Sequence, residues 1–170
     1  AVERWNRLGR GKPVWMVLQA FSWSNLNKER PVLYPTFTET RFMAYDVIAR
    51  GVKGIQYWGS AYLKSEDFRQ SIYAMTSELS ALQPFLVVPD EKGLMVTIIE
   101  LLSLEPITGV RAFARRAGND WLVVLVNEDN DKHMGVEVTG LDKLDGRRLE
   151  LLYGAEHADV EGGEFIARLQ

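Results

Sequence analysis

The fold is decided by the stretch Lys12-Pro-Val-Trp-Met-Val-Leu-Gln-Ala-Phe-Ser-Trp23. Val14 to Leu18 form a nearly unbroken apolar run, which is typical of a parallel strand covered on both faces. The run ends in polar and aromatic residues, and ligands of α/β proteins bind at that end of a strand. A second strand is predicted from Gly54 to Trp58. Because one helix separates the two strands, a right-handed parallel crossover is expected.

The helix between these strands has a clear start signal. Thr36-Phe-Thr-Glu39 matches a capping box, in which the Thr hydroxyl and the Glu carboxylate each accept from a backbone donor of the first turn. The helix is expected to run to about Ala49, before Gly51. Residues 1–8 are expected to be the end of an amphipathic helix, which Gly9 and Gly11 stop.

A third helix is predicted after the second strand. Its apolar residues recur at steps of four and three, which places them on one stripe facing a core. Pro84 is expected to mark its end. The stripe consists of Phe68, Ile72, Met75, Leu79 and Leu82.

The pattern changes near residues 89–93, where we place a domain boundary between residues 1–88 and residues 94–170. The second part consists of short β-rich runs separated by Gly, Asn and Asp turns, a spacing that favours an antiparallel β-sandwich. Ala117-Gly-Asn-Asp120 is a good hairpin turn. The predicted strands are Val110 to Arg116, Trp121 to Val126, Val136 to Val138, Leu149 to Tyr153 and Phe165 to Leu169.

Composition excludes several classes of protein. The net charge is -3, and residues 128–170 carry five Lys and Arg against eleven Asp and Glu. Neither half has the dense basic patch that a nucleic-acid partner would need. No apolar run is long enough to span a membrane, and no signal peptide is evident. With no cysteine, a disulfide framework and a thiolate metal site are excluded, but the compartment stays unknown.

Metal and cofactor signals are weak. Asp129-Asn-Asp131 has the start of a calcium loop, but Met134 stands where the loop needs Gly, so a hairpin turn is favoured. His133 and His157 have no metal-ligand spacing and are expected to lie in exposed loops. We therefore predict no metal and no cofactor.

Three motifs follow one another in the order found in a known class of enzymes. They are Pro35-Thr-x-x-Glu-x-Arg41, Gly51-x-Lys-Gly-Ile-x-Tyr57 and Glu78-Leu-x-x-Leu-x-Pro84. The chain resembles the last two β/α units of a (β/α)8 barrel of the glycoside hydrolase type, followed by its C-terminal β-sandwich. The resemblance implies an incomplete barrel segment, because a closed barrel takes roughly 200 residues or more.

The resemblance also implies where the chemistry would lie. Relatives often place a carboxylate at the end of the seventh strand, and Gln19 takes that position here. An amide can hydrogen-bond a sugar hydroxyl, but it cannot replace either of the two carboxyl groups that glycoside hydrolysis needs. Trp23, Tyr57 and Trp58 are candidate sugar-stacking surfaces, with core packing as the alternative. The catalytic residues are unknown.

Other polar residues of this part are expected to be structural. Glu39 belongs to the capping box, and Arg41 and Asp46 suit solvated or paired positions on a helix. The loop from Ser22 to Leu33 is long and polar, which suits either a surface that touches substrate or a mobile linker.

The sequence thus predicts the C-terminal part of a carbohydrate-active protein, which contributes part of a sugar-binding cleft and is not catalytic alone. The alternative is a non-enzymatic carbohydrate-binding or structural module. Strands without barrel neighbours would expose edges and apolar faces, so a homo-oligomer is expected.

Overall fold

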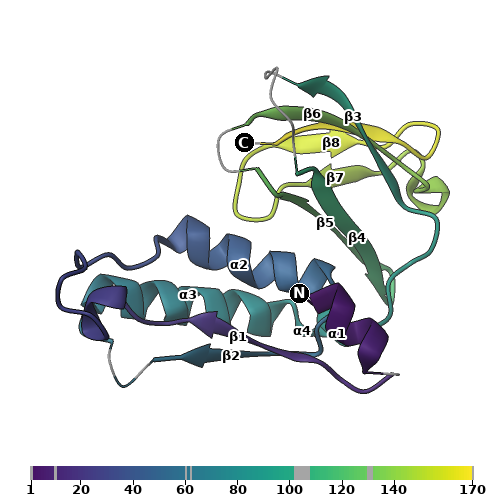
Figure 1. The fold of residues 1–170 in the computed structure, drawn as a ribbon. Helices are drawn as coiled ribbons and strands as arrows, with labels where there is room; N and C mark the ends of the chain where they lie inside the picture. Colours follow the sequence, from purple (N-terminus) through teal and green to yellow (C-terminus); the bar gives the residue numbers. More distant parts are fainter. Residues whose placement is uncertain are drawn as a thin grey trace. The chain divides into compact units, whose positions relative to one another are not determined.

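The computed structural model describes residues 2–9, 11–59, 61, 63–101, 108–129 and 132–169. The chain divides into two compact units, Ala1–Val87 and Val88–Gln170, which we call unit 1 and unit 2. Unit 1 is mixed α/β, and unit 2 consists mostly of antiparallel sheets (Figure 1).

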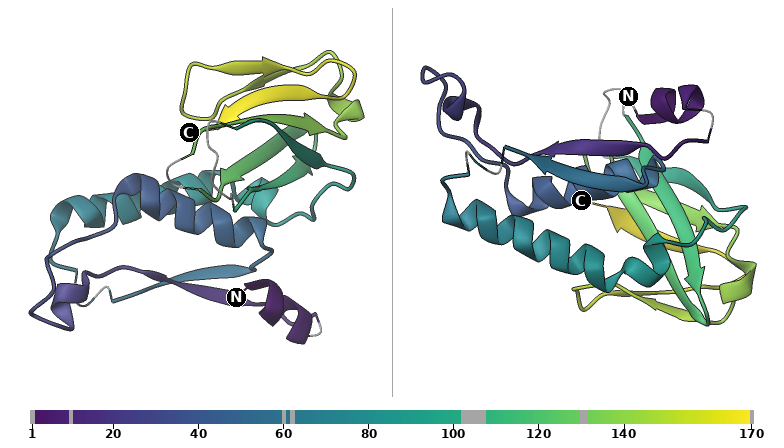
Figure 2. Two further views of the ribbon diagram at one scale, coloured as in Figure 1. Left: turned by 45° about the horizontal axis from the view of Figure 1, so that its top comes forward. Right: turned by 90° about the horizontal axis from the view of Figure 1, so that it is seen from below.

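Unit 1 contains one parallel pair of strands with helices. Strand β1 (Trp15–Gln19) pairs with β2 (Gly54–Trp58), so the predicted parallel pairing is confirmed. The two long helices lie on the same side of this pair (Figures 1 and 2). The helical elements are α1 (Val2–Leu8), η1 (Trp23–Asn25), α2 (Phe37–Ala49), α3 (Glu66–Ala81) and α4 (Gln83–Leu86).

The two faces of the β1–β2 pair differ in burial. Leu18 points to the helices and is buried, whereas Trp15 is 65% and Val17 54% exposed on the opposite face. The expectation that β1 is covered on both faces is therefore wrong for this chain, because α2 and α3 both pack on one side. Trp15 lies across Gly54, where an added Cβ would come within 2.5 Å of the Trp15 ring. Only glycine leaves room for this contact.

Helix α2 starts as the sequence predicts. Thr36 Oγ1 accepts a hydrogen bond from the Glu39 amide, and the Glu39 carboxylate accepts one from the Thr36 amide. The capping box is thus confirmed, and the Glu39 side chain has a structural role at the helix N-terminus.

One buried carboxylate joins α2 to α3. Glu78 Oε1 accepts from Arg41 Nε at 3.0 Å and from the Tyr45 hydroxyl at 2.5 Å. Asp46 in turn pairs with Arg50, one turn further along α2. Arg41 and Asp46 are therefore paired helix residues, as expected.

The apolar stripe of α3 is confirmed at its ends and centre, where Phe68, Met75 and Leu82 are buried. The helix end differs from the prediction. Helix α3 ends at Ala81, and Pro84 lies in the first turn of α4. Proline is tolerated there because the first amides of a helix have no partner within it.

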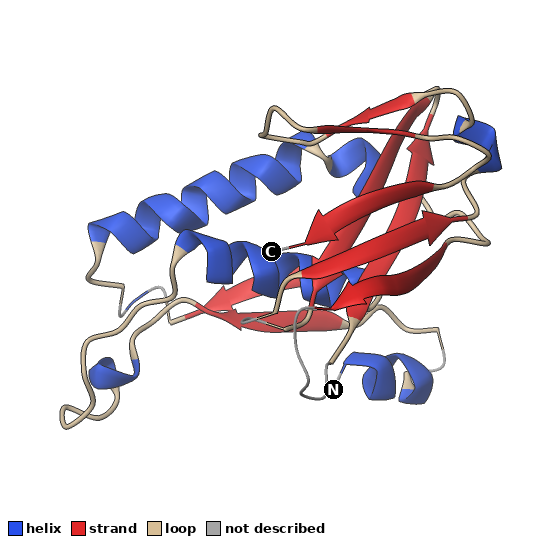
Figure 3. Cartoon of the chain, turned by 90° about the horizontal axis from the view of Figure 1, so that it is seen from above, coloured by secondary structure: helices blue, strands red, loops and turns tan. Residues whose placement is uncertain are grey.

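The described residues of unit 2 form three antiparallel sheets, with strand orders β3-β6-β9, β4-β5 and β7-β8 (strands in red in Figure 3). The hairpin at Gly118 and Asn119 is confirmed by the pairing of Ala117 with Asp120. The strands are β3 (Met95–Leu101), β4 (Val110–Ala117), β5 (Asp120–Asn127), β6 (Met134–Thr139), β7 (Arg148–Glu150), β8 (His157–Asp159) and β9 (Phe165–Leu169), with the short helix η3 (Asp142–Leu144) after β6.

Two predicted features of unit 2 are wrong in detail. The strand expected from Leu149 to Tyr153 ends at Glu150, because a turn follows in which Tyr153 has a φ of 65°. His157 is exposed, but it lies on strand β8 and not in a loop. Strands β3 and β8 had no strand prediction of their own.

Side chains from several sheets of unit 2 share one core. Val136, Val138 and Val160 are fully buried in it, and Ala114 of the β4–β5 hairpin joins them. The remaining buried members are Met134, Leu141, Leu144 and Phe165.

Candidate functional site

Two of the four candidate residues lie side by side at the carboxyl ends of the parallel strands. Gln19 ends β1, Trp58 ends β2, and the two are paired in register. Both therefore project from the same face of the pair, which is the face opposite the helices. Trp58 is 47% exposed there, and Gln19 is partly buried.

Phe21 connects the two candidate tryptophans. Its buried ring packs edge-on against Trp23, at 4.9 Å between centroids, and against Trp58, at 5.0 Å. Gly59, with a φ of 94°, makes room, because a Cβ there would come within 2.8 Å of the Phe21 side chain. We call Phe21, Trp23 and Trp58 the aromatic cluster. Trp23 is 55% exposed, and its contact with Phe21 holds it next to the strand ends.

The amide of Gln19 is held beside this cluster. Its Nε2 donates to the carbonyl oxygen of Phe21 at 2.7 Å. Within the described residues, its Oε1 accepts no hydrogen bond and is available to a ligand hydroxyl. The arrangement places one polar acceptor next to an exposed aromatic surface.

Tyr57 lies apart from the other three candidates. It pairs with Leu18 and points to the helix-covered face. Its hydroxyl is buried and has no hydrogen-bond partner among the described residues. Burial raises the pKa of the Tyr57 phenol above its ordinary value. The geometry therefore places Tyr57 in the packing between sheet and helices.

The long loop after β1 is ordered by one buried side chain. Ser22 is fully buried, and its hydroxyl oxygen accepts from the amide of Leu33 at 3.0 Å and from that of Ser24 at 3.4 Å. This contact closes the loop, since it brings together residues 22 and 33. Both expectations for this loop, a surface that touches substrate and a mobile linker, stay predictions.

Tyr34 ties this loop to the loop after β2. Its hydroxyl accepts from the Lys64 amide at 3.2 Å and from Asn25 Nδ2 at 3.4 Å. Its ring packs against that of Phe68, with centroids 5.4 Å apart. Between the two loops lies an open pocket of about 540 Å³, which we call the loop pocket. Its lining residues are Ser24, Asn25, Lys28, Arg30, Val32, Tyr34, Lys64 and Ser65.

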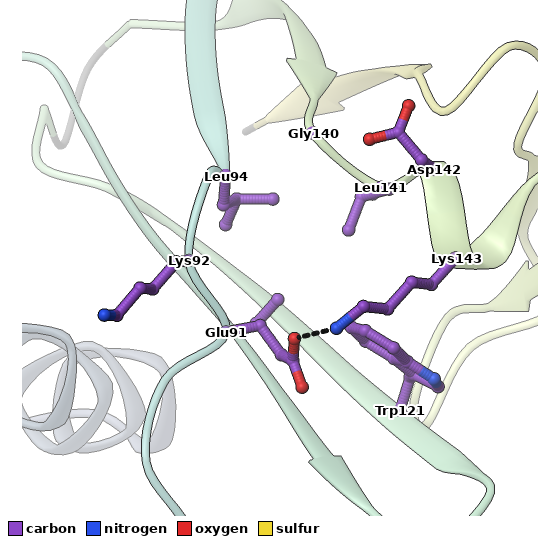
Figure 4. A pocket seen from close by; sticks show the side chains of 9 residues that line it. Glu91, Lys92, Leu94, Trp121, Gly140, Leu141, Asp142 and Lys143 are labelled. Carbon is purple, nitrogen blue, oxygen red and sulfur yellow. Dashed lines mark hydrogen bonds and ion pairs between the residues drawn. The ribbon is translucent and has the colours of Figure 1, made fainter.

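A second, smaller pocket of about 90 Å³ lies in unit 2 (Figure 4). Lys143 Nζ binds Glu91 at 2.7 Å and lies 5.7 Å from the centre of the Trp121 ring. Trp121 itself packs against the core of unit 2. This pocket is thus lined by one aromatic ring and by a lysine that is paired with a glutamate.

The described residues contain no group of three His, Asp or Glu side chains that could hold a metal ion. Asp129 accepts hydrogen bonds from the amides of Thr108 and Gly109, so it joins the segment before β4 to the segment after β5. Asp131 lies outside the described residues. Among the helices described, none is long and apolar enough to cross a membrane.

Comparisons with protein-family models, with curated proteins and with solved structures find no match for this chain. Sequence reasoning missed three residues that build the site, namely Phe21, Ser22 and Tyr34. The alternation Phe21-Ser22-Trp23 directly after a strand was the available signal for the first two.

Proposed function

We propose that this chain is the C-terminal part of a carbohydrate-active, glycoside hydrolase-like protein, in which unit 1 contributes one wall of a sugar-binding cleft. The chain is not catalytic alone in this proposal. Unit 1 corresponds to an incomplete (β/α) barrel segment of two β/α units, and unit 2 to the β-sandwich that follows it.

The observation that carries the proposal is the grouping of Gln19, Trp58 and Trp23 at the carboxyl ends of two parallel strands. Sugar rings present C–H faces to aromatic rings and hydroxyls to polar groups. An exposed tryptophan surface beside an amide oxygen offers both kinds of contact. The carboxyl ends of parallel strands are also where α/β proteins bind ligands.

The one-sided sheet supports the barrel part of the proposal. In a (β/α)8 barrel, helices cover the outer face of the strands, and the other face lines the packed interior. The helix-free face of β1 and β2 carries Val17 and Gln19, which would point into such an interior. It is exposed in this chain, as a barrel segment without its neighbouring strands would be.

The residues at the strand ends support the proposal that the chain is not catalytic alone. Glycoside hydrolysis takes a pair of carboxyl groups flanking the bond. Gln19 and Trp58, the last residues of β1 and β2, supply none, and Glu39 is held in the capping box. Any catalytic pair would have to come from other strands of a longer protein.

Titration of the chain with an oligosaccharide panel, followed by NMR of the tryptophan indole groups, tests the proposal. Trp58→Ala and Trp23→Ala should each weaken sugar binding by about tenfold, since each removes a stacking surface. Trp5→Ala is the matched control, because Trp5 is an equally exposed tryptophan on α1. Equal losses in all three variants, or no sugar binding, would contradict the proposal.

The alternative is a non-enzymatic carbohydrate-binding or structural module, and the Trp121 pocket of unit 2 is the observation in its favour. Lys143 and Arg116 flank the Trp121 ring, at 5.7 and 5.9 Å from its centre. Sugar binding that is lost in Trp121→Phe and kept in Trp58→Ala would favour this alternative.

We further propose that a second copy of this chain covers the part of the exposed β1–β2 face that carries Trp15 and Val17, and leaves Gln19 and Trp58 at the carboxyl ends of the strands open to a sugar. The face presents Trp15 and Val17 to solvent, and exposed apolar patches mark association surfaces.

A further inference from the structure

We propose that the loop pocket binds the negatively charged group of an acidic saccharide, a uronate carboxylate or a sulfate ester. This inference rests on the proposed function, because it names the class of sugar that the aromatic cluster would hold. The two sites are continuous in the chain, since Trp23 of the cluster is followed directly by Ser24 and Asn25 of the pocket.

The pocket is held in place from two sides. Ser22 closes the loop after β1, and Tyr34 ties that loop to the backbone of Lys64 in the loop after β2. Lys28 and Arg30 therefore face a common space with Lys64, although they are more than 30 residues apart from it. Its volume of about 540 Å³ lies within the range of roughly 300–1,000 Å³ that is usual for small-molecule sites.

The lining is cationic. Lys28, Arg30 and Lys64 supply three positive charges, and no described lining residue is an acid. None of the three forms an ion pair with another described residue. Like charges gathered without a counter-charge repel one another, and a bound anion would relieve that repulsion.

The acidic residues nearest in sequence to the pocket cations either bind other side chains or do not line the pocket. Glu66, in the first turn of α3, binds Arg69 at 2.6 Å and Gln70 at 2.8 Å. Glu29 lies between the two loop cations in sequence but does not line the pocket. The pocket itself thus keeps its positive charge.

The start of α3 adds to this field. Ser65 lines the pocket and caps the 16-residue helix α3, accepting from the Phe68 amide at 3.2 Å. The N-terminus of a helix carries a partial positive charge that favours anions. Ser24 and Asn25 place hydroxyl and amide groups beside the cations, which suits the hydroxyls around a sugar acid.

The test compares three probes on the full chain by NMR titration: trigalacturonate, its neutral methyl ester and a sulfated galactose oligosaccharide. The methyl ester is the matched control, because it keeps the sugar rings and removes the charge. We expect both acidic probes to bind about tenfold or more tightly than the ester, with the preference falling as salt is added.

The triple variant Lys28→Ala, Arg30→Ala, Lys64→Ala should abolish this preference and leave binding of the ester unchanged. Each single variant should reduce acidic binding by roughly threefold. The control Arg7→Ala, Lys12→Ala, Lys53→Ala removes the same charge away from the pocket, from α1 and from positions before β1 and β2. It should keep the preference.

The outcomes separate this inference from the proposed function. Equal binding of the ester and the acids would overturn the anion site and leave the sugar cleft standing. A preference that survives in the triple variant would overturn the assignment to these cations. Binding of inorganic sulfate at Lys64 without binding of any saccharide would support an anion site but overturn the acidic-sugar assignment and the sugar cleft together.

Discussion

The two units of this chain differ in how completely they bury the apolar side chains of their sheets. Unit 2 shares one core among its sheets, where Val136, Val138 and Val160 are fully buried. Unit 1 covers only one face of its two-stranded sheet and leaves Val17 and Trp58 exposed on the other. Because apolar burial is the main favourable term in folding, unit 2 is expected to be self-sufficient. Unit 1 leaves one apolar face of its sheet exposed, where a partner or a ligand can bind.

The largest effect should come from the core of unit 2. Leu144 is 2% exposed, so Leu144→Ala should lower the free energy of unfolding by about 2–5 kcal/mol, from lost burial and the cavity left behind. Val17→Ala on the open face of unit 1 should cost less than about 1 kcal/mol when it is measured at a protein concentration at which the chain is monomeric. Chemical denaturation of the two variants measures both values.

A probe specific to unit 2 sharpens this comparison. Trp121 is the one tryptophan after residue 87, so a fluorinated tryptophan gives one ¹⁹F resonance for that unit. Leu144→Ala should shift the transition seen at this resonance. If Val17→Ala destabilises the monomer as much as Leu144→Ala does, the open face is buried within one chain and the contrast between the units is wrong.

The next effect concerns the buried carboxylate that joins the helices of unit 1. Glu78→Gln removes the charge that Arg41 binds and should cost about 1–3 kcal/mol, because the buried Glu78 carboxylate loses its ion pair with Arg41, whose side chain is 37% exposed. Glu66→Gln is the control on the same helix, since the Glu66–Arg69 pair is solvent-exposed and worth less than about 1 kcal/mol. Chemical denaturation at neutral pH compares them. Equal costs would mean that Glu78 adds nothing to the joining of α2 and α3.

The sequence predicts those parts of the fold that depend on neighbouring residues better than those that depend on residues far apart in the chain. The capping box at Thr36 and the hairpin at Gly118 depend on neighbouring residues, and both are confirmed. Strand β8 was not predicted, because it has only three residues and its pairing with β7 is set by the chain around it. Strand β3 was missed although its seven residues are mostly apolar. The expectation that β1 is covered on both faces was wrong, since an apolar run does not reveal whether one or both faces of a strand are packed against other elements.

The residues of the candidate site also divide into those that local sequence signals predict and those that depend on distant contacts. Gln19 and Trp58 were selected as strand-end residues, and the parallel register explains why they lie together. Tyr57, one residue earlier, points to the other face, which follows from the alternation of side chains along a strand. Tyr34 could not be selected from the sequence, because its role depends on a hydrogen bond to a loop 30 residues away.

The open face of unit 1 gives the third prediction. If a second copy covers this face, sedimentation velocity should show a dimer or larger oligomer for the unmodified chain. Val17→Lys places a charge on the face without disturbing the helix-covered side and should shift the population to monomer. Ile166→Lys is the control, because Ile166 is an equally exposed apolar strand residue of unit 2. A monodisperse monomer of the unmodified chain would refute the homo-oligomer.

The smallest effect concerns the covered face of unit 1. The Tyr57 hydroxyl is buried without a partner among the described residues, so Tyr57→Phe should leave stability at neutral pH unchanged or slightly higher. Tyr34→Phe, by contrast, removes an acceptor of two hydrogen bonds and should cost about 1 kcal/mol. Chemical denaturation separates the two variants. Equal costs would show that the Tyr57 hydroxyl has a partner.

The pH dependence of stability tests the same burial independently. Because the pKa of Tyr57 is raised in the folded chain, the unfolded chain loses this proton first as the pH rises through the ordinary value of a phenol. The stabilisation is complete below that value and is lost as the pH rises towards the folded pKa. Between about pH 9 and 11, the unmodified chain should therefore lose more stability than Tyr57→Phe. Parallel curves would place the Tyr57 hydroxyl in contact with water.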